Sequence, residues 1–111
     1  MLYSFTGGKD GRYPYGPFVF DGSGNLYGAT SGDVSCPHGN RWGCGNIFEM
    51  TPESSGWNLR VLHTFTGGGH GAYPSPPVFD GGGNLFGVAY DGGNCKKGYG
   101  EYCGLAFELT P

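Results

Sequence analysis

Apolar and polar residues alternate over short runs of this chain, in the pattern that predicts β-strands. The clearest run places Phe48 and Met50 on one face of a strand and Ile47, Glu49 and Thr51 on the other. No stretch carries apolar residues at the i, i+3, i+4 and i+7 positions of a helix, and glycine or proline interrupts almost every ten residues. The pattern therefore predicts an all-β fold.

Four strands are predicted in the first half of the chain, each bounded by turn-forming residues, at 18–21, 26–30, 46–51 and 57–66. Between the first two, the segment Asp21-Gly-Ser-Gly-Asn25 resembles part of a calcium-binding loop. We favour a hairpin turn, because aspartate at a hairpin end commonly accepts hydrogen bonds from its own backbone. Residues 67–77 are rich in glycine and proline and are predicted to form a connector that cannot continue a strand ladder.

The whole pattern occurs twice. Residues 19–28 return at 78–87 and residues 46–52 at 105–111, both at an offset of 59, while residues 2–8 return at 62–68 at an offset of 60. A fixed period of this size indicates supersecondary units that bury their apolar faces against one another. Four short antiparallel strands per unit are typical of a β-propeller blade. We predict two propeller-type blades, residues 7–66 and residues 67–111.

The second blade has no counterpart of the strand predicted at 57–66, and residues 1–6 resemble the end of that strand. We expect residues 1–6 of another copy of the chain to complete it, since propellers have about four to eight blades and an unfilled edge is a template for pairing. The result would be a closed ring or an open filament. The alternative is a pair of repeats cut from a longer array. The residues expected at this contact are Leu2, Tyr3, Ser4, Phe5, Phe107 and Leu109.

Two observations would count against this assembly: residues 1–6 loose in solvent, or residues 1–6 folded onto their own first blade with the final strand left unpaired. An edge strand that natural proteins leave bare is a liability for aggregation. The position of residues 1–6 is therefore the observation that tests the predicted assembly.

Composition narrows the range of partners. The 25 glycines and eight prolines would suggest disorder in an aperiodic chain, but the repeat and an aromatic share of 16% oppose it. A net charge of −3, with 14% charged residues, offers no basic surface for nucleic acid and no polybasic patch for a membrane. No segment has the apolar length of a membrane span.

Four cysteines occupy equivalent positions of the two repeats, which favours the disulfides Cys36–Cys44 and Cys95–Cys103 and an oxidising, extracellular setting. A metal site is the alternative, because Cys36, His38 and Cys44 could supply three ligands. The second loop has no histidine, and a structural zinc site needs four ligands. We therefore predict disulfides, with no metal and no cofactor.

The segments Leu2–Gly8, Phe20–Gly28 and Cys44–Pro52, with the connector Asp10–Pro14, resemble bacterial secreted tandem-repeat proteins of the GloVer type. The resemblance covers nearly the whole chain. Proteins of that type carry many such repeats, resemble β-propellers and are attached to the cell surface by varied C-terminal anchors. The resemblance implies an exported surface protein, and it carries over no catalytic motif.

No catalytic constellation stands out in the sequence. Glu49 and Glu108 take the same place in each repeat, so they are not expected to face one another across a substrate as the two acids of a glycosidase do. A paired glutamate on a blade face, opposite Arg60, is favoured instead. No nucleophile elbow or phosphate-binding loop is present. We predict that the protein is not an enzyme.

The sequence thus favours an extracellular structural or interaction protein whose partner is a second copy of itself. The alternative is a lectin-like carbohydrate-binding module, because flat aromatic side chains in loops can bind sugars. The residues proposed for a glycan are Trp42, Tyr99 and Tyr102.

Overall fold

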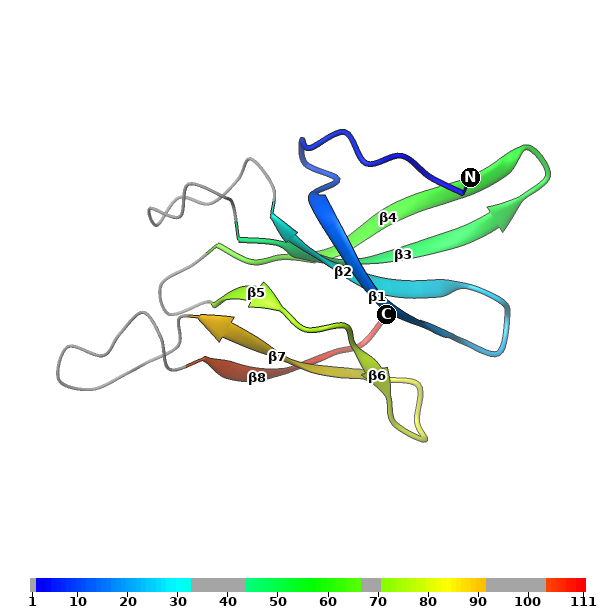
Figure 1. Ribbon diagram of the computed structural model, residues 1–111. Coiled ribbons are helices and arrows are strands. Elements are labelled where there is room, and N and C mark those ends of the chain that lie inside the picture. Colours follow the sequence, from blue (N-terminus) through cyan, green and yellow to red (C-terminus); the bar gives the residue numbers. More distant parts are fainter. Residues whose placement is uncertain (1, 33–43, 67–70, 92–103) are drawn as a thin grey trace, which may run out of the picture.

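The computed structural model describes residues 2–32, 44–66, 71–91 and 104–111, and these residues form strands and no helix. Two antiparallel sheets of four strands each lie one against the other (Figure 1). The all-β prediction is confirmed. The first sheet contains β1 (Arg12–Phe20), β2 (Leu26–Gly32), β3 (Asn46–Glu53) and β4 (Gly56–Thr64). The second contains β5 (Ala72–Pro74), β6 (Val78–Phe79), β7 (Leu85–Asp91) and β8 (Leu105–Leu109).

The two sheets place their equivalent strands in the same order. The second is three strands wide, because two of its four strands lie end to end beside the same neighbour. The first sheet has the order β1-β2-β3-β4. In the second, β7 pairs with β8 on one side and with both β5 and β6 on the other, so β5 and β6 together take the place of β1. Pro14 pairs with Thr30 in the first sheet, and Pro74 pairs with Ala89 in the second. The sequence repeat is therefore also a repeat of register.

The prediction that residues 67–77 cannot continue a ladder is wrong, because β5 lies within them and pairs with β7. The equivalent strand β1 likewise begins at Arg12, ahead of the predicted start at residue 18. Both strands lie at sheet edges, where a proline without an N–H removes no bond between strands. Tyr13 and Tyr73 both have positive φ angles, 56° and 57°, and bend the chain at the same point of each repeat.

The other predicted strands are confirmed to within a few residues. In β3 the side chains alternate as expected: Phe48 and Met50 belong to one apolar cluster, and Ile47 belongs to another. The strand predicted at 57–66 ends at Thr64, but Phe65 still donates its backbone N–H to the carbonyl oxygen of Gly45 at 3.0 Å. The hydrogen-bonded pairing thus extends one residue beyond β4.

A core between the sheets, here called the inter-sheet core, holds them together. Tyr27 and Ile47 of the first sheet and Leu85 and Ala89 of the second are all buried in it. The ring of Phe79 packs edge-on against that of Tyr27, with centroids 5.0 Å apart. A second cluster, Leu26, Phe48 and Met50, lies on the face of the first sheet that is turned away from the second.

A buried polar pair distinguishes the first repeat from the second. Thr30 Oγ1 donates to Asn46 Oδ1 at 3.0 Å, and Asn46 Nδ2 donates to the carbonyl oxygen of Asp10 at 3.0 Å. Both side chains are fully buried, and each has its hydrogen-bond partners, as buried polar groups require. The second repeat has Ala89 and Leu105 at these positions. The same backbone is thus held by hydrogen bonds in one repeat and by apolar contact in the other.

The turn between β1 and β2 confirms the hairpin interpretation. Asp21 Oδ1 accepts hydrogen bonds from the backbone N–H groups of Ser23 at 2.8 Å and Asn25 at 3.0 Å. Asp80 accepts the equivalent bonds in the second repeat. Both carboxylates therefore close a turn of their own backbone. In the part of the chain that the structure describes, no helix is long and apolar enough to cross a membrane.

Candidate functional site: the outer faces and the open edge

Residues 2–6 form no strand in the single chain and lie on the outward-facing cluster of the first sheet. The Phe5 ring packs edge-on against Phe48, with centroids 5.2 Å apart, and against Tyr3 at 5.0 Å. The Tyr3 hydroxyl donates to Asp10 Oδ2 at 2.8 Å, and the backbone N–H of Thr6 donates to the same oxygen at 3.0 Å. The segment is therefore anchored by ring packing and by one carboxylate.

Residues 2–6 thus fold onto the first sheet of their own chain, and this placement counts against the prediction that only a neighbouring chain holds them. Within the described residues, β8 pairs with β7 and has no strand on its other side. The predicted contact residues Phe107 and Leu109 point into the inter-sheet core, not outward from the edge. Leu2 and Ser4 are exposed. Pairing of residues 1–6 with β8 of a second copy lies beyond a single chain and stays a prediction.

The residues equivalent to Tyr3 and Phe5 in the next repeat, His63 and Phe65, make the same kind of ring contacts. They do so at the end of strand β4. Phe65 packs edge-on against Phe107 at 5.3 Å and against His63 at 4.7 Å. His63 takes the place of Tyr3, and Phe65 takes that of Phe5, at the offset of 60. Phe65 thus lies on the second sheet while His63 pairs with β3 of the first. Packing on one sheet and pairing in the preceding one are compatible.

The outer face of the second sheet carries exposed apolar residues. Val78 and Phe86 are register partners, and Val88 lies two residues further along β7, so all three share one face. Leu85 and Ala89, which alternate with them, are buried in the inter-sheet core.

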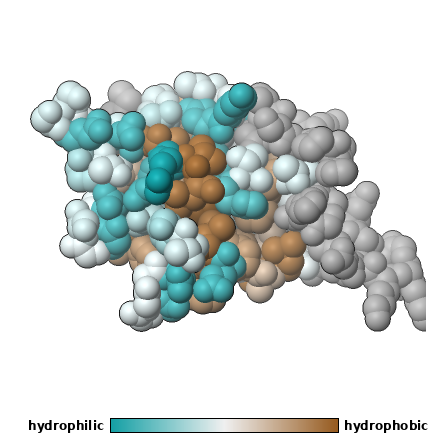
Figure 2. All heavy atoms as spheres, turned by 180° about the vertical axis from the view of Figure 1, so that it is seen from behind, coloured by the Kyte–Doolittle hydropathy of each residue, from teal (hydrophilic) through white to brown (hydrophobic). Residues whose placement is uncertain are grey.

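Figure 2 shows, on the side opposite to that of Figure 1, an area of apolar residues bordered by hydrophilic ones. The exposed large apolar residues of the described chain are Leu2, Tyr13, Phe18, Phe20, Val78, Phe86, Val88 and Tyr90.

A polar network occupies the equivalent face of the first sheet. The Tyr27 hydroxyl shares its one proton between Glu49 Oε2 at 2.8 Å and Asp21 Oδ2 at 3.0 Å. Arg60 forms an ion pair with Glu49 at 2.8 Å. The predicted pairing of Glu49 with Arg60 is confirmed. The role of Tyr27 was not predicted. Its replacement by Phe86 at the same position of the second repeat was the available signal.

The network shifts the pKa values of two of its members. Burial, followed by the hydrogen bonds to Glu49 and Asp21, raises the pKa of Tyr27 well above its usual value. Desolvation would raise the pKa of Asp21, but hydrogen bonds from Asn25, Ser23 and Tyr27 outweigh it and lower that pKa to about 2. Tyr27 is therefore held as a neutral donor and Asp21 as a charged acceptor at neutral pH.

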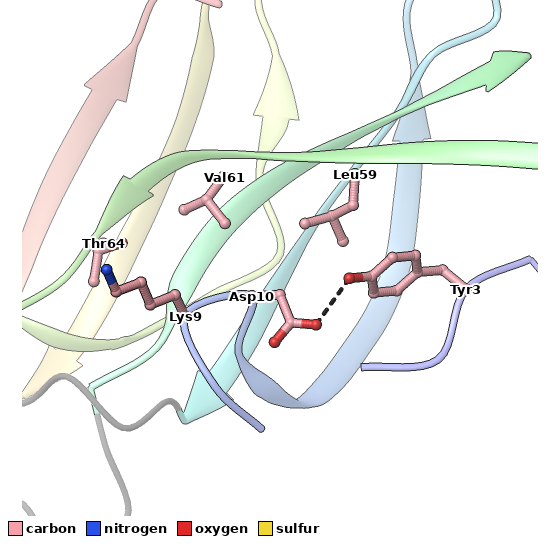
Figure 3. A pocket seen from close by; sticks show the side chains of 6 residues that line it. All are labelled: Tyr3, Lys9, Asp10, Leu59, Val61 and Thr64. Carbon is pink, nitrogen blue, oxygen red and sulfur yellow. Dashed lines mark hydrogen bonds between the residues drawn. The ribbon is translucent and has the colours of Figure 1, made fainter. Parts of the chain in front are cut away.

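A pocket of about 500 Å³ lies between the N-terminal segment and β4, lined by Tyr3, Lys9, Asp10, Leu59, Val61 and Thr64. Figure 3 shows Tyr3 directed at Asp10, with Leu59 and Val61 on the ribbon opposite them. The Asp10 carboxylate is occupied by Tyr3 and Thr6, and these hydrogen bonds outweigh desolvation and lower its pKa. The arrangement anchors the N-terminal segment to the first sheet. Within the described residues, no group of three or more histidine, cysteine or acidic side chains could hold a metal ion.

Two predictions concern residues outside the described ranges. The glycan-binding aromatics Trp42, Tyr99 and Tyr102 all lie there, so carbohydrate binding stays a prediction. Of the four cysteines, Cys44 is described and is completely buried. The other three, Cys36, Cys95 and Cys103, lie outside these ranges, and the pairing of the cysteines stays a prediction.

Comparison with protein-family models, with curated proteins and with solved structures finds no match for this chain. The two repeats of the chain are therefore compared with each other.

Proposed function

We propose that this protein is an extracellular structural subunit that assembles with copies of itself. Its two sheets act as neighbouring blades of a β-propeller-type array, and residues 1–6 of one copy complete the second sheet of the next. The product is a ring or a filament, depending on whether the rotation between copies closes. The protein is not an enzyme in this proposal, and its partner is a second copy of the chain.

The observation that carries the proposal is the match between two sets of ring contacts. Phe5 packs on Phe48 of the first sheet and Tyr3 packs on Phe5, just as Phe65 packs on Phe107 of the second sheet and His63 packs on Phe65. In the second set, the segment that supplies the rings also belongs to the edge strand of the preceding sheet. Within the chain, residues 2–6 make the ring contacts but have no strand pairing. A sheet edge beside them would supply the strand pairing.

The open edge of β8 is the edge that the repeat assigns to them. Thr64 pairs with Asn46 at the start of β3. The equivalent positions of the repeat are Ser4 and Leu105, so Ser4 of one copy is expected opposite Leu105 of its neighbour. An edge strand whose N–H and C=O groups are unpaired is a template for such an addition.

Ser4→Pro tests the pairing without removing the rings of Tyr3 and Phe5. Proline has no N–H and interrupts a strand ladder, while Ser4→Ala keeps the N–H and serves as the matched control. Light scattering over a range of concentrations is expected to show assemblies for the natural chain and for Ser4→Ala, and single chains for Ser4→Pro. A natural chain that has the mass of one chain at every concentration would show the proposal to be wrong.

The extracellular setting is supported by the repeated cysteine positions and by the resemblance to secreted repeat proteins. Mass spectrometry of the unreduced protein, digested between the two cysteine pairs, tests it. Peptides linked as Cys36–Cys44 and Cys95–Cys103 are expected, and four free thiols in protein purified from its natural source would contradict it.

A further inference from the structure

Equivalent residues of the two sheets differ sharply in exposure, although their backbones match. Tyr27 is 3% exposed and Ala29 is 0% exposed, because the second sheet covers them. Phe86 and Val88 occupy the same positions of the second repeat and are 37% and 43% exposed. Apolar residues placed on this face are buried by a neighbouring sheet in the first repeat. In the second they have no such cover within the described residues.

The covering surface is also repeated. In the second sheet, Phe79 lies next to Leu85 and packs on Tyr27 of the first. The equivalent residue of the first sheet is Phe20, which lies next to Leu26 on the face turned away from the second sheet. Phe20 is 64% exposed. The chain thus has two uncovered rings on opposite outer faces. Phe20 is the equivalent of the covering ring Phe79, and Phe86 is the equivalent of the covered ring Tyr27.

We infer that a second copy of this chain docks on the outer face of the second sheet with the outer face of its first sheet, and that Phe20 of one copy packs on Phe86 of the other. The contact reproduces between chains the packing of Phe79 on Tyr27 within one chain. This inference rests on the proposed function and adds to it the faces that meet. Strand addition concerns the backbone edge of β8, whereas this contact concerns side chains on the sheet faces.

A second copy is the favoured occupant because both surfaces are versions of surfaces that already pack together. On one side, Phe20 and Leu26 stand where Phe79 and Leu85 stand in the second repeat. The residue at the other side, Phe86, differs from Tyr27 only by the loss of a hydroxyl. That hydroxyl serves Asp21 and Glu49 inside its own sheet and is not needed for the edge-on ring contact. Edge-on aromatic pairs are favourable beyond their area of burial.

Cross-linking between two single variants tests the contact. Phe20→Cys and Phe86→Cys are mixed in equal amounts under mild oxidation, and the product is digested and sequenced by mass spectrometry so that the natural cysteines are distinguished. A bond between positions 20 and 86 is expected at a yield ~10-fold above that of the control mixture, Ser54→Cys with Phe86→Cys. Ser54 lies in the exposed turn between β3 and β4 and is outside both faces.

A second measurement uses charge to disrupt the same faces. Phe86→Glu and Phe20→Glu are each expected to raise the dissociation constant for self-association ~10-fold or more, as truncation of a buried interface aromatic does. Ser54→Glu is expected to leave it unchanged. Circular dichroism of the dilute variants verifies that they fold.

The outcomes separate this inference from the proposed function. If the natural chain assembles and Ser4→Pro abolishes assembly, but the 20–86 bond does not exceed the control and Phe86→Glu assembles normally, the face contact is wrong and strand addition stands. If the natural chain is a single chain at every concentration, both are wrong. A 20–86 bond above the control, together with weaker assembly of Phe86→Glu, supports the inference.

Discussion

The ring of Phe79 meets the ring of Tyr27 edge-on, with centroids 5.0 Å apart and planes inclined at 87°. The hydroxyl of the same tyrosine shares its proton between the carboxylates of Glu49 and Asp21. One side chain therefore joins the two sheets through its ring and ties β2 to β3 through its hydroxyl. Its buried position and its two carboxylate partners make it the best single point at which to test the packing of the first sheet.

Tyr27→Phe converts this position to the residue of the second repeat. Loss of the hydroxyl leaves Glu49 with Arg60 and keeps the ring contact. The expected cost is therefore about 1.5–3 kcal/mol of the free energy of unfolding, the range for hydrogen bonds to charged groups. Urea denaturation measures it. In a double-mutant cycle with Glu49→Gln, the two effects are expected to be non-additive, because the residues are in direct contact. Simple additivity would contradict the role of this bond.

Phe65→Ala tests the link between β4 and the second sheet. Phe65 is almost fully buried and packs against both Phe107 and His63. Removal of a buried phenylalanine ring costs about 3–5 kcal/mol, a large part of the stability of a small domain. The control is Phe20→Ala, measured at a dilution where the chain is monomeric, with an expected change within about 0.5 kcal/mol. Equal losses for the two variants would contradict the assignment of Phe65 to the core.

Acid is expected to weaken the hairpin between β1 and β2. The pKa of Asp21 is lowered to about 2 in the folded chain and is about 3.9 in an unfolded one. Its contribution to stability is therefore complete above pH 4 or so and is lost as the pH falls through about 2. Asp21→Asn is expected to flatten the fall in the urea midpoint between pH 4 and pH 2. An unchanged slope would show that the carboxylate does not matter to folding.

Gly45→Ala and Gly24→Ala form a matched pair. Both glycines have positive φ angles, 91° and 86°, so an alanine is strained at either. At Gly24 an added Cβ would meet nothing within 4 Å, but at Gly45 it would overlap the carbonyl oxygen of Thr30. Gly24→Ala is expected to cost about 1 kcal/mol, and Gly45→Ala an additional 1–3 kcal/mol or so for overpacking. Equal thermal stability of the two variants would contradict the close approach at Gly45.

Strands β2, β3 and β4 could be predicted because their side chains alternate between two apolar faces, as Phe48 and Ile47 do. The edge strands β1 and β5 were harder. Both contain proline and a tyrosine at positive φ, features that propensity alone assigns to a loop. At an edge, neither feature breaks a ladder.

The N-terminal segment shows a different limit of prediction. Its likeness to residues 61–66 predicted a strand that completes an open sheet edge, and that pairing stays a prediction. The sequence did not show that one residue of such a segment can pack on one sheet while its neighbours pair in another. The contacts of Phe65 and His63 reveal this. The exposed pair Phe20 and Phe86 likewise required the faces to be known, because strand period alone does not say which face is covered.

The contrast between Thr30 with Asn46 and Ala89 with Leu105 has a consequence for temperature. Apolar attraction weakens on cooling, because its driving force near room temperature is entropic. Strand β5, which begins at Ala72, follows Gly71, which lies close to the apolar side chains of Ala89 and Leu105. Strand β1, which begins at Arg12, follows the carbonyl oxygen of Asp10, which accepts a hydrogen bond from the amide of Asn46. On cooling, the protection of backbone amides against hydrogen exchange is therefore expected to fall first at Ala72 and Tyr73, and later at Arg12 and Tyr13.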